Sequence, residues 1–140
     1  MKTVISKTFE FDAGHRLSKG YVGNCSRPHG HRYKVELELS STKLDRFDMI
    51  VDFNELKPFK QWLDSTFDHK FMIWVDDKVR EELEMLFGAE AIVSMEQNPT
   101  AEHIAIVILA AAMQWPEWGS FVTAVTVWET PNSFARVEVK

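Results

Sequence analysis

The sequence contains a single cysteine among its 140 residues, so no disulfide bond can form within the chain. It also has no apolar run long enough to span a bilayer, because the most apolar segment covers only residues 104–113. No apolar stretch of the kind found in signal peptides follows the first methionine. We therefore expect a cytoplasmic protein with no membrane-spanning segment.

Long basic runs, internal repeats and low-complexity tracts are absent as well. Sixteen Lys and Arg residues against 21 Asp and Glu residues give a net charge of -5, which argues against nucleic acid as a partner. A hydrophobic fraction of 45% and a charged fraction of 26% are typical of globular proteins and exclude a disordered or fibrous chain. The length fits one domain, residues 1–140, with a single core.

The hydrophobic pattern predicts strands near both ends of the chain and helices between them. β-Branched content or period-two alternation predicts strands over residues 2–12, 33–39, 121–129 and 135–139. Apolar residues at near-helical spacing predict one helix that begins near Asp52 or Asn54 and another that begins at the capping residue Thr100. Weaker patterns predict a strand or strand end over residues 49–53, a helix over 76–87 and a strand over 91–95. This order indicates an α+β domain, with helices on one face of an antiparallel sheet.

Two histidines lie two residues apart in His29-Gly30-His31, at the start of a predicted strand. Side chains at positions i and i+2 point to the same face of a strand, so both imidazoles can bind one metal ion. His15 ends the preceding strand, and an antiparallel neighbour can present it to that same face. Three histidines that leave a fourth position open are typical of a catalytic zinc site. The His-Gly-His motif is short and is weak evidence by itself. The alternative to a metal site is that these are surface or core histidines with ordinary hydrogen bonds.

Other residues with possible chemical roles are weaker signals when each is taken by itself. Cys25 precedes His29 by four residues, and its thiolate could act as a general base near a metal, or the thiol could be inert. Asp68 can orient the adjacent His69 for proton transfer. Glu129 ends an apolar strand, where its carboxylate could accept two hydrogen bonds from an amidine-like ring edge or simply be solvated.

The whole set of motifs, in this order, resembles the signature segments of the 6-pyruvoyltetrahydropterin synthase family. The matching segments run nearly from end to end of the chain: FDAGHRL (11–17), CSRPHGHRY (25–33), VDF (51–53), FDH (67–69), PTAE (99–102) and VWET (127–130). Three residues separate Cys25 from His29, which is similar to the 6-carboxytetrahydropterin synthase branch. The chain departs from the family where Gly14, Phe67 and His103 replace the usual Ala, Leu and Asn.

The resemblance implies a tunnelling fold, with a four-stranded antiparallel sheet, helices on one face, and subunits that assemble into a barrel. It also implies a homo-oligomer, a hexamer in the family, with active sites at subunit interfaces. Zn²⁺ would bind to His15, His29 and His31. Cys25 would be the proton-abstracting base, the pair Asp68 and His69 would transfer protons, and Glu129 would bind the pterin. These roles come from the resemblance and are expectations.

The implied reaction converts 7,8-dihydroneopterin triphosphate to 6-carboxy-5,6,7,8-tetrahydropterin, with loss of acetaldehyde and triphosphate. Such a lyase would serve the route to queuosine and other 7-deazaguanines, and it needs no redox cofactor. Two other enzymes stay open, namely a 6-pyruvoyltetrahydropterin synthase and a pterin aldolase of the same fold, in which the histidines would have no purpose. A non-catalytic zinc-stabilised binding module is the alternative from a different class, and such a module would unfold when the metal is removed.

Overall fold

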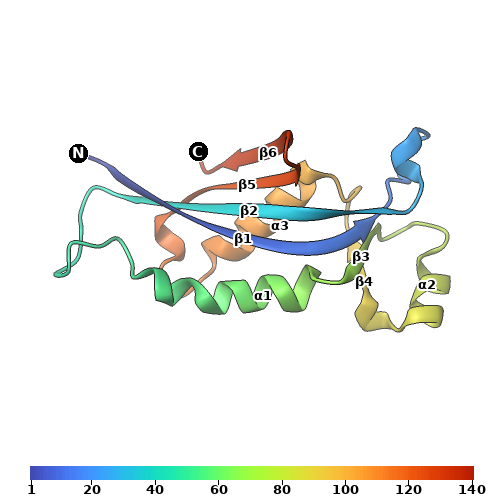
Figure 1. The fold of residues 1–140 in the computed structure, drawn as a ribbon, viewed down its shortest axis with the longest axis horizontal. Helices are drawn as coiled ribbons and strands as arrows, with labels where there is room; N and C mark the ends of the chain where they lie inside the picture. The colour runs from blue at the N-terminus through green and yellow to red at the C-terminus, as the bar shows by residue number, and fades with distance from the viewer.

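Two long antiparallel strands run the length of the molecule in the computed structural model, which describes residues 1–140 (Figure 1). β1 (Thr3–His15) pairs with β2 (His29–Ser41) along its full length. The register places His15 opposite His29. Alternate side chains are buried in the second half of β1, from Phe9 to His15, and in β2 from Tyr33 to Leu39, and they form one wall of the core.

The sheet has six strands in the order β4-β3-β1-β2-β5-β6. β5 (Val122–Thr130) and β6 (Ser133–Glu138) form the predicted C-terminal hairpin. β3 (Lys70–Trp74) and β4 (Ile92–Met95) extend the sheet beyond β1, and both run parallel to their inner neighbours. The α+β class is therefore confirmed, but the expectation of four antiparallel strands is wrong: the sheet is mixed and has two more strands.

Two of the three helices pack on the same face of the sheet. α1 (Lys57–Phe67) and α3 (Ala101–Met113) contribute buried side chains to one core cluster with β1, β2 and β5. The Thr100 hydroxyl accepts a hydrogen bond from the His103 backbone N–H at 3.2 Å, so the predicted cap of α3 is confirmed. α2 (Arg80–Phe87) lies beside the end of the sheet, buries none of its residues and ends at Gly88, which has a φ of 92°.

The segment that precedes α1 differs from the expectation. Residues 49–52 do not form a strand: residues 50 and 51 are bends, and the segment leads into a 3₁₀ turn over Phe53–Leu56. The Asp52 carboxylate accepts a hydrogen bond from the Asn54 N–H at 2.9 Å, so it caps this turn and not the α-helix. The buried residues Ile50 and Val51 account for the apolar pattern without any strand pairing. No helix is long and apolar enough to cross a membrane.

Candidate metal and substrate site

Three histidines converge where β1 ends and β2 begins. The pairing of His15 with His29 places their imidazoles side by side, and His31 follows two residues later on the same face. One ring nitrogen of each of the three histidines lies within 4.8 Å of the others. The sequence-based prediction that these side chains share one site is therefore confirmed as geometry.

Backbone carbonyls fix the orientation of two of these rings. His15 Nδ1 lies 2.7 Å from the carbonyl oxygen of Pro99, and His29 Nδ1 lies 2.7 Å from that of Arg27. A carbonyl oxygen can only accept, so each Nδ1 must carry the proton and each Nε2 of the neutral ring carries a lone pair. The two Nε2 atoms nevertheless lie 3.0 Å apart. Two facing lone pairs at this distance repel each other unless a proton or a metal cation lies between them.

Burial disfavours the proton and leaves the metal as the better partner. His15 is 1% exposed, and burial is the main cause that lowers its pKa; burial also lowers the pKa of His31. His31 Nε2 is buried and has no hydrogen-bond partner. Three imidazoles with converging ring nitrogens, two of them oriented by backbone carbonyls, are an arrangement that suits a divalent cation such as zinc, so the residues present fit this ion.

The Glu129 carboxylate faces the three histidines from the end of β5. Its Oε1 atom lies 3.5 Å from His15 Nε2 and 3.6 Å from His31 Nε2. The ladder between β2 and β5 begins only at Lys34 and Trp128, so the strands are separated where Glu129 lies. A cleft of about 400 Å³ fills that gap and has no hydrophobic lining residue. We call it the Glu129 cleft, and it is lined by Glu10, His31, Arg32, Lys34, Glu129, Thr130 and Pro131.

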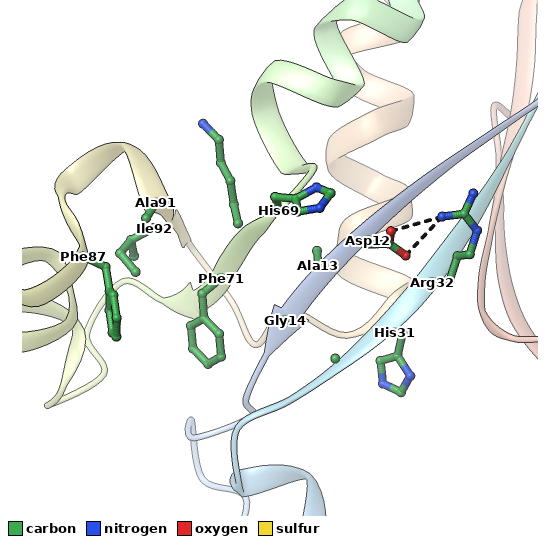
Figure 2. Close-up of a pocket in the computed structure, with 12 residues that line it drawn as sticks. Asp12, Ala13, Gly14, His31, Arg32, His69, Phe71, Phe87, Ala91 and Ile92 are labelled. Carbon is green, nitrogen blue, oxygen red and sulfur yellow. Dashed lines mark hydrogen bonds and ion pairs between the residues drawn. The ribbon is translucent and has the colours of Figure 1, made fainter.

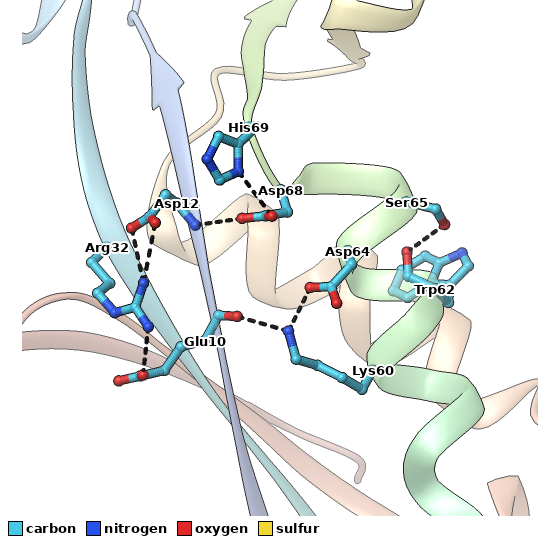
Figure 3. Close-up of polar contacts among 9 residues, drawn as sticks. All are labelled: Glu10, Asp12, Arg32, Lys60, Trp62, Asp64, Ser65, Asp68 and His69. Carbon is cyan, nitrogen blue, oxygen red and sulfur yellow. Dashed lines mark hydrogen bonds and ion pairs between the residues drawn. The ribbon is translucent and has the colours of Figure 1, made fainter.

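Asp68 and His69 are held by both backbone groups of a single β1 residue, Asp12, and Figure 3 shows the bond from its N–H to Asp68. The Asp12 N–H donates to Asp68 Oδ1 at 2.9 Å, and the Asp12 carbonyl accepts from the His69 N–H at 2.7 Å. The second oxygen of Asp68 lies 2.9 Å from His69 Nδ1. The bond from Asp12 is the main cause that lowers the pKa of Asp68, and the bond to Asp68 raises the pKa of His69. His69 has a φ of 59°, a left-handed conformation that this two-point attachment maintains.

His69 faces a second and larger cleft of about 740 Å³ (Figure 2). We call it the glycine cleft, because Gly14 and Gly30, which are direct partners in the β1–β2 ladder, lie in its lining between His69 and His31. Phe71, Phe87 and Ile92 give it an apolar wall. His31 and Arg32 line both clefts. The structure thus brings Glu129 to the histidines and leaves His69 in the other cleft, and the two clefts share only the strands β1 and β2.

Cys25 lies in a short 3₁₀ turn, Asn24–Ser26, within the loop that joins β1 to β2. Its thiol is partly buried and does not belong to the group of converging ligand atoms, which consists of the histidines alone. The Cys25 carbonyl accepts a hydrogen bond from the Leu17 N–H at 2.8 Å, which closes this loop on itself.

The groups that orient the predicted side chains were not predicted from the sequence. The carbonyls of Arg27 and Pro99 belong to the backbone, and nothing in a sequence marks a carbonyl as a hydrogen-bond partner. Arg32 also went unnoticed; it binds the carboxylates of Glu10 and Asp12 at 3.0–3.2 Å on the rim of both clefts. The only sequence signal for Arg32 was its position directly after His31.

The α+β sheet and its site define a protein with the tunnelling fold. The family model described as 6-pyruvoyl tetrahydropterin synthase matches residues 4–140, and the chain belongs to this family. A relative from Rickettsia conorii named 6-carboxy-5,6,7,8-tetrahydropterin synthase is 36% identical over 94% of this chain and 97% of its own length. The protein of the same name from Aquifex aeolicus is 34% identical over 97% and 98% of the two chains.

Solved structures agree with the fold. The crystal structure of an uncharacterized protein from Wolinella succinogenes is 27% identical and has a TM-score of 0.87 over 100% of this chain and 99% of that one. The 6-pyruvoyl tetrahydropterin synthase of Caenorhabditis elegans is 21% identical and has a TM-score of 0.74 over 100% and 97%. At that identity the second likeness supports the fold alone.

Proposed function

We propose that this chain is a zinc-dependent 6-carboxy-5,6,7,8-tetrahydropterin synthase, a lyase that acts on 7,8-dihydroneopterin triphosphate and releases acetaldehyde and triphosphate. The observation that carries the proposal is the convergence of one ring nitrogen from each of three histidines, with the carboxylate of Glu129 facing two of them. The names of the relatives from Rickettsia conorii and Aquifex aeolicus support the choice of product. A cytoplasmic location and a role in queuosine or other 7-deazaguanine synthesis belong to the same proposal.

His15, His29 and His31 would hold the zinc ion. When bound, zinc would supply Lewis-acid polarisation of oxygen atoms on the substrate side chain. The Pro99 and Arg27 carbonyls keep two of the rings in the tautomer that leaves Nε2 free, so little reorganisation is needed on metal binding. Glu129, at the edge of the cluster, would accept two parallel N–H donors from the amino-pyrimidine edge of the pterin.

Proton transfer would be divided between two groups. The Cys25 thiolate would remove a carbon-bound proton from the side chain of the substrate. His69, whose pKa is raised by its hydrogen bond to Asp68, would hold a proton at Nε2 and deliver it from the other side of the reacting carbon. In a single chain, His69 and Glu129 line different clefts.

Assembly of several copies would place His69 of one copy and Glu129 of another in the same site. Residues 3–9 of β1 have no strand partner on the side away from β2, and the outer edge of β6 is also unpaired. We propose that β6 of one copy pairs antiparallel with β1 of the next and closes a barrel, which removes both edges. Antiparallel pairing would bring the start of β6, and Glu129 just before it, close to Asp12 and His69 of the neighbouring copy.

Product analysis tests the proposed activity. Zinc-loaded protein is incubated with dihydroneopterin triphosphate, and the products are identified by mass spectrometry. We expect 6-carboxytetrahydropterin together with acetaldehyde. A 6-pyruvoyl product with loss of triphosphate alone would reassign the reaction. Absence of turnover, together with unfolding when the metal is removed, would favour the non-catalytic zinc module.

Metal content tests the ligand set independently of turnover. Elemental analysis should find about one zinc per chain. His29→Ala and His31→Ala should lose most of it while they stay folded. His103→Asn is the matched control, because His103 lies on the first turn of α3 outside the cluster and the usual family residue there is Asn. Full zinc occupancy in the two alanine variants would show that the ligand assignment is wrong.

A further inference from the structure

The loop between β1 and β2 starts directly after a histidine of the cluster and carries the only cysteine. Its first residue, Arg16, donates from Nε to Asp77 Oδ2 at 2.8 Å. The Asp77 side chain is fully buried and that of Arg16 is 20% exposed. The other oxygen of Asp77 accepts from the Val79 N–H at 2.9 Å, so both carboxylate oxygens have a partner.

Asp77 lies in the turn between β3 and α2, far from the loop along the chain. The parallel pairing of His15 with Met72 brings this turn beside the point where β1 ends. A buried ion pair is weak evidence for stability, because desolvation of both charges offsets most of their attraction. The Arg16–Asp77 pair joins the β1–β2 loop to the turn between β3 and α2. We therefore explain it by the specific loop conformation that it selects.

The ion pair is one of several interactions that hold the start of the loop. The Leu17 N–H donates to the Cys25 carbonyl at 2.8 Å, so the beginning of the loop is bonded directly to the residue that bears the thiol. The Asn98 side chain accepts from the N–H groups of Ser18 and Lys19 at 3.1 and 2.9 Å. Among these interactions only the Arg16–Asp77 pair joins two opposite charges, and its carboxylate is fully buried.

We propose that the Arg16–Asp77 ion pair is a positioning device that holds the loop, and with it the Cys25 thiol, in a fixed place relative to the histidine cluster before substrate binds. The contribution of the ion pair to turnover rests on the proposed function, in which Cys25 is the base. The effect of the ion pair on the position of the loop is independent of the proposed function. Neither Arg16 nor Asp77 touches substrate in this role, because both act through the backbone between residues 16 and 25.

The test uses the single cysteine as a reporter. The rate at which iodoacetamide labels the native protein at Cys25 is compared in the unmodified chain, Asp77→Asn and Arg16→Gln. Release of the loop should raise this rate by about threefold to tenfold, because local opening exposes the thiol. Zinc content should stay unchanged, because the histidines are held by the sheet and by the Pro99 and Arg27 carbonyls. If the chain is an active synthase, kcat should fall more than KM rises.

Controls separate positioning from general destabilisation. Asp76→Asn removes an equal charge from an exposed neighbouring residue and should label like the unmodified chain. Arg16→Lys keeps the charge and should give a rate between those of the unmodified chain and Arg16→Gln. If Asp77→Asn does not fold, Arg16→Gln carries the test, because Arg16 lies partly in solvent. Unchanged labelling in every folded variant of the pair would overturn the proposal, whether or not the protein turns over a pterin.

Discussion

At the scale of single residues, the histidine cluster makes the metal-free chain sensitive to acid. Burial lowers the pKa of His15 and of His31 below the ordinary value of 6.5, so below that pH the unfolded chain binds protons that the folded chain resists. The stability linked to these two groups is present above 6.5 and is lost as the pH falls toward the folded values. The contribution of His69 to stability changes with pH in the opposite direction, because its raised pKa stabilises the folded chain below pH 6.5.

The metal-free protein should therefore unfold more easily at a pH about one unit below 6.5 than at a pH about one unit above it. Urea denaturation at the two pH values measures the difference. His31→Asn should reduce the difference, and His69→Asn should increase it, because the second change removes an opposing contribution. Equal stability at both pH values in all three proteins would mean that the histidines do not resist protonation.

Glu129 provides the second prediction at this scale. Glu129→Gln keeps nearly the same size, but an amide can accept only one of two parallel N–H donors from a pterin edge. The variant should keep zinc and lose about 1.5–3 kcal/mol of binding to the transition state. That corresponds to a loss of about tenfold to a hundredfold in kcat/KM. Steady-state kinetics measure this loss, and a pterin titration measures ground-state binding.

Loss of zinc in Glu129→Gln would instead make the carboxylate a metal ligand, since its Oε1 lies 3.5 Å from His15 Nε2. Unchanged kinetics and unchanged pterin binding would remove Glu129 from the site. Glu36→Gln is a suitable control, because that carboxylate also lies on the sheet and accepts from Trp128 Nε1 at 2.9 Å, outside both clefts.

Sequence reasoning reached the ligand cluster because strand geometry alone determines it. Once His29 and His31 begin a strand and His15 ends its antiparallel neighbour, all three face one side. The Pro99 carbonyl, by contrast, is 84 residues from His15 along the chain. Only the packing of α3 against the sheet brings it there, and tertiary packing of that kind leaves no local pattern.

At the scale of elements, the mixed sheet is the main departure from expectation. β3 is a short apolar run, and its central residues Met72 and Ile73 are fully buried. A strand covered on both faces shows no alternation, so periodicity does not distinguish it from the end of the preceding helix. The sequence pattern therefore missed β3, and without β3 the parallel pairing of β4 could not be predicted either.

The pairing of β3 with β1 explains a family departure. A Cβ atom added at Gly14 would lie 2.9 Å from Cδ2 of Phe71, which is its partner across the ladder. Gly14→Ala should therefore destabilise the fold by about 1–3 kcal/mol through overpacking. Phe71→Leu in the same chain should recover most of that loss, as a double-mutant cycle in chemical denaturation would measure. Additive losses would show that the two side chains do not compete for this space.

At the scale of the whole molecule, the two clefts pose the main functional question. His69 lines the glycine cleft and Glu129 lines the other. Residues 3–9 of β1 and the outer side of β6 present unpaired edges at opposite sides of the four antiparallel strands β1, β2, β5 and β6. If copies join through these edges, each active site combines His69 of one copy with the histidine cluster and Glu129 of the next. A site formed within one chain would need no partner.

Mixing two impaired variants distinguishes these arrangements. In a shared site, His69→Ala chains still supply an intact Glu129, and Glu129→Gln chains still supply an intact His69. Random assembly at equal amounts should therefore leave both residues intact in about one quarter of the sites. Activity should rise toward that proportion after the variants are unfolded together and refolded, whereas each variant treated alone should keep only its low residual activity.

The matched control mixes His69→Ala with Asp68→Asn. These defects lie in adjacent residues of the same pair, so every site in the mixture has a damaged Asp68–His69 pair and activity should not return. Native mass spectrometry establishes that subunits have exchanged in both mixtures. Exchange without recovery in the mixture of His69→Ala and Glu129→Gln would show that both residues act within one chain, and the pairing of β6 with β1 would then lose its functional basis.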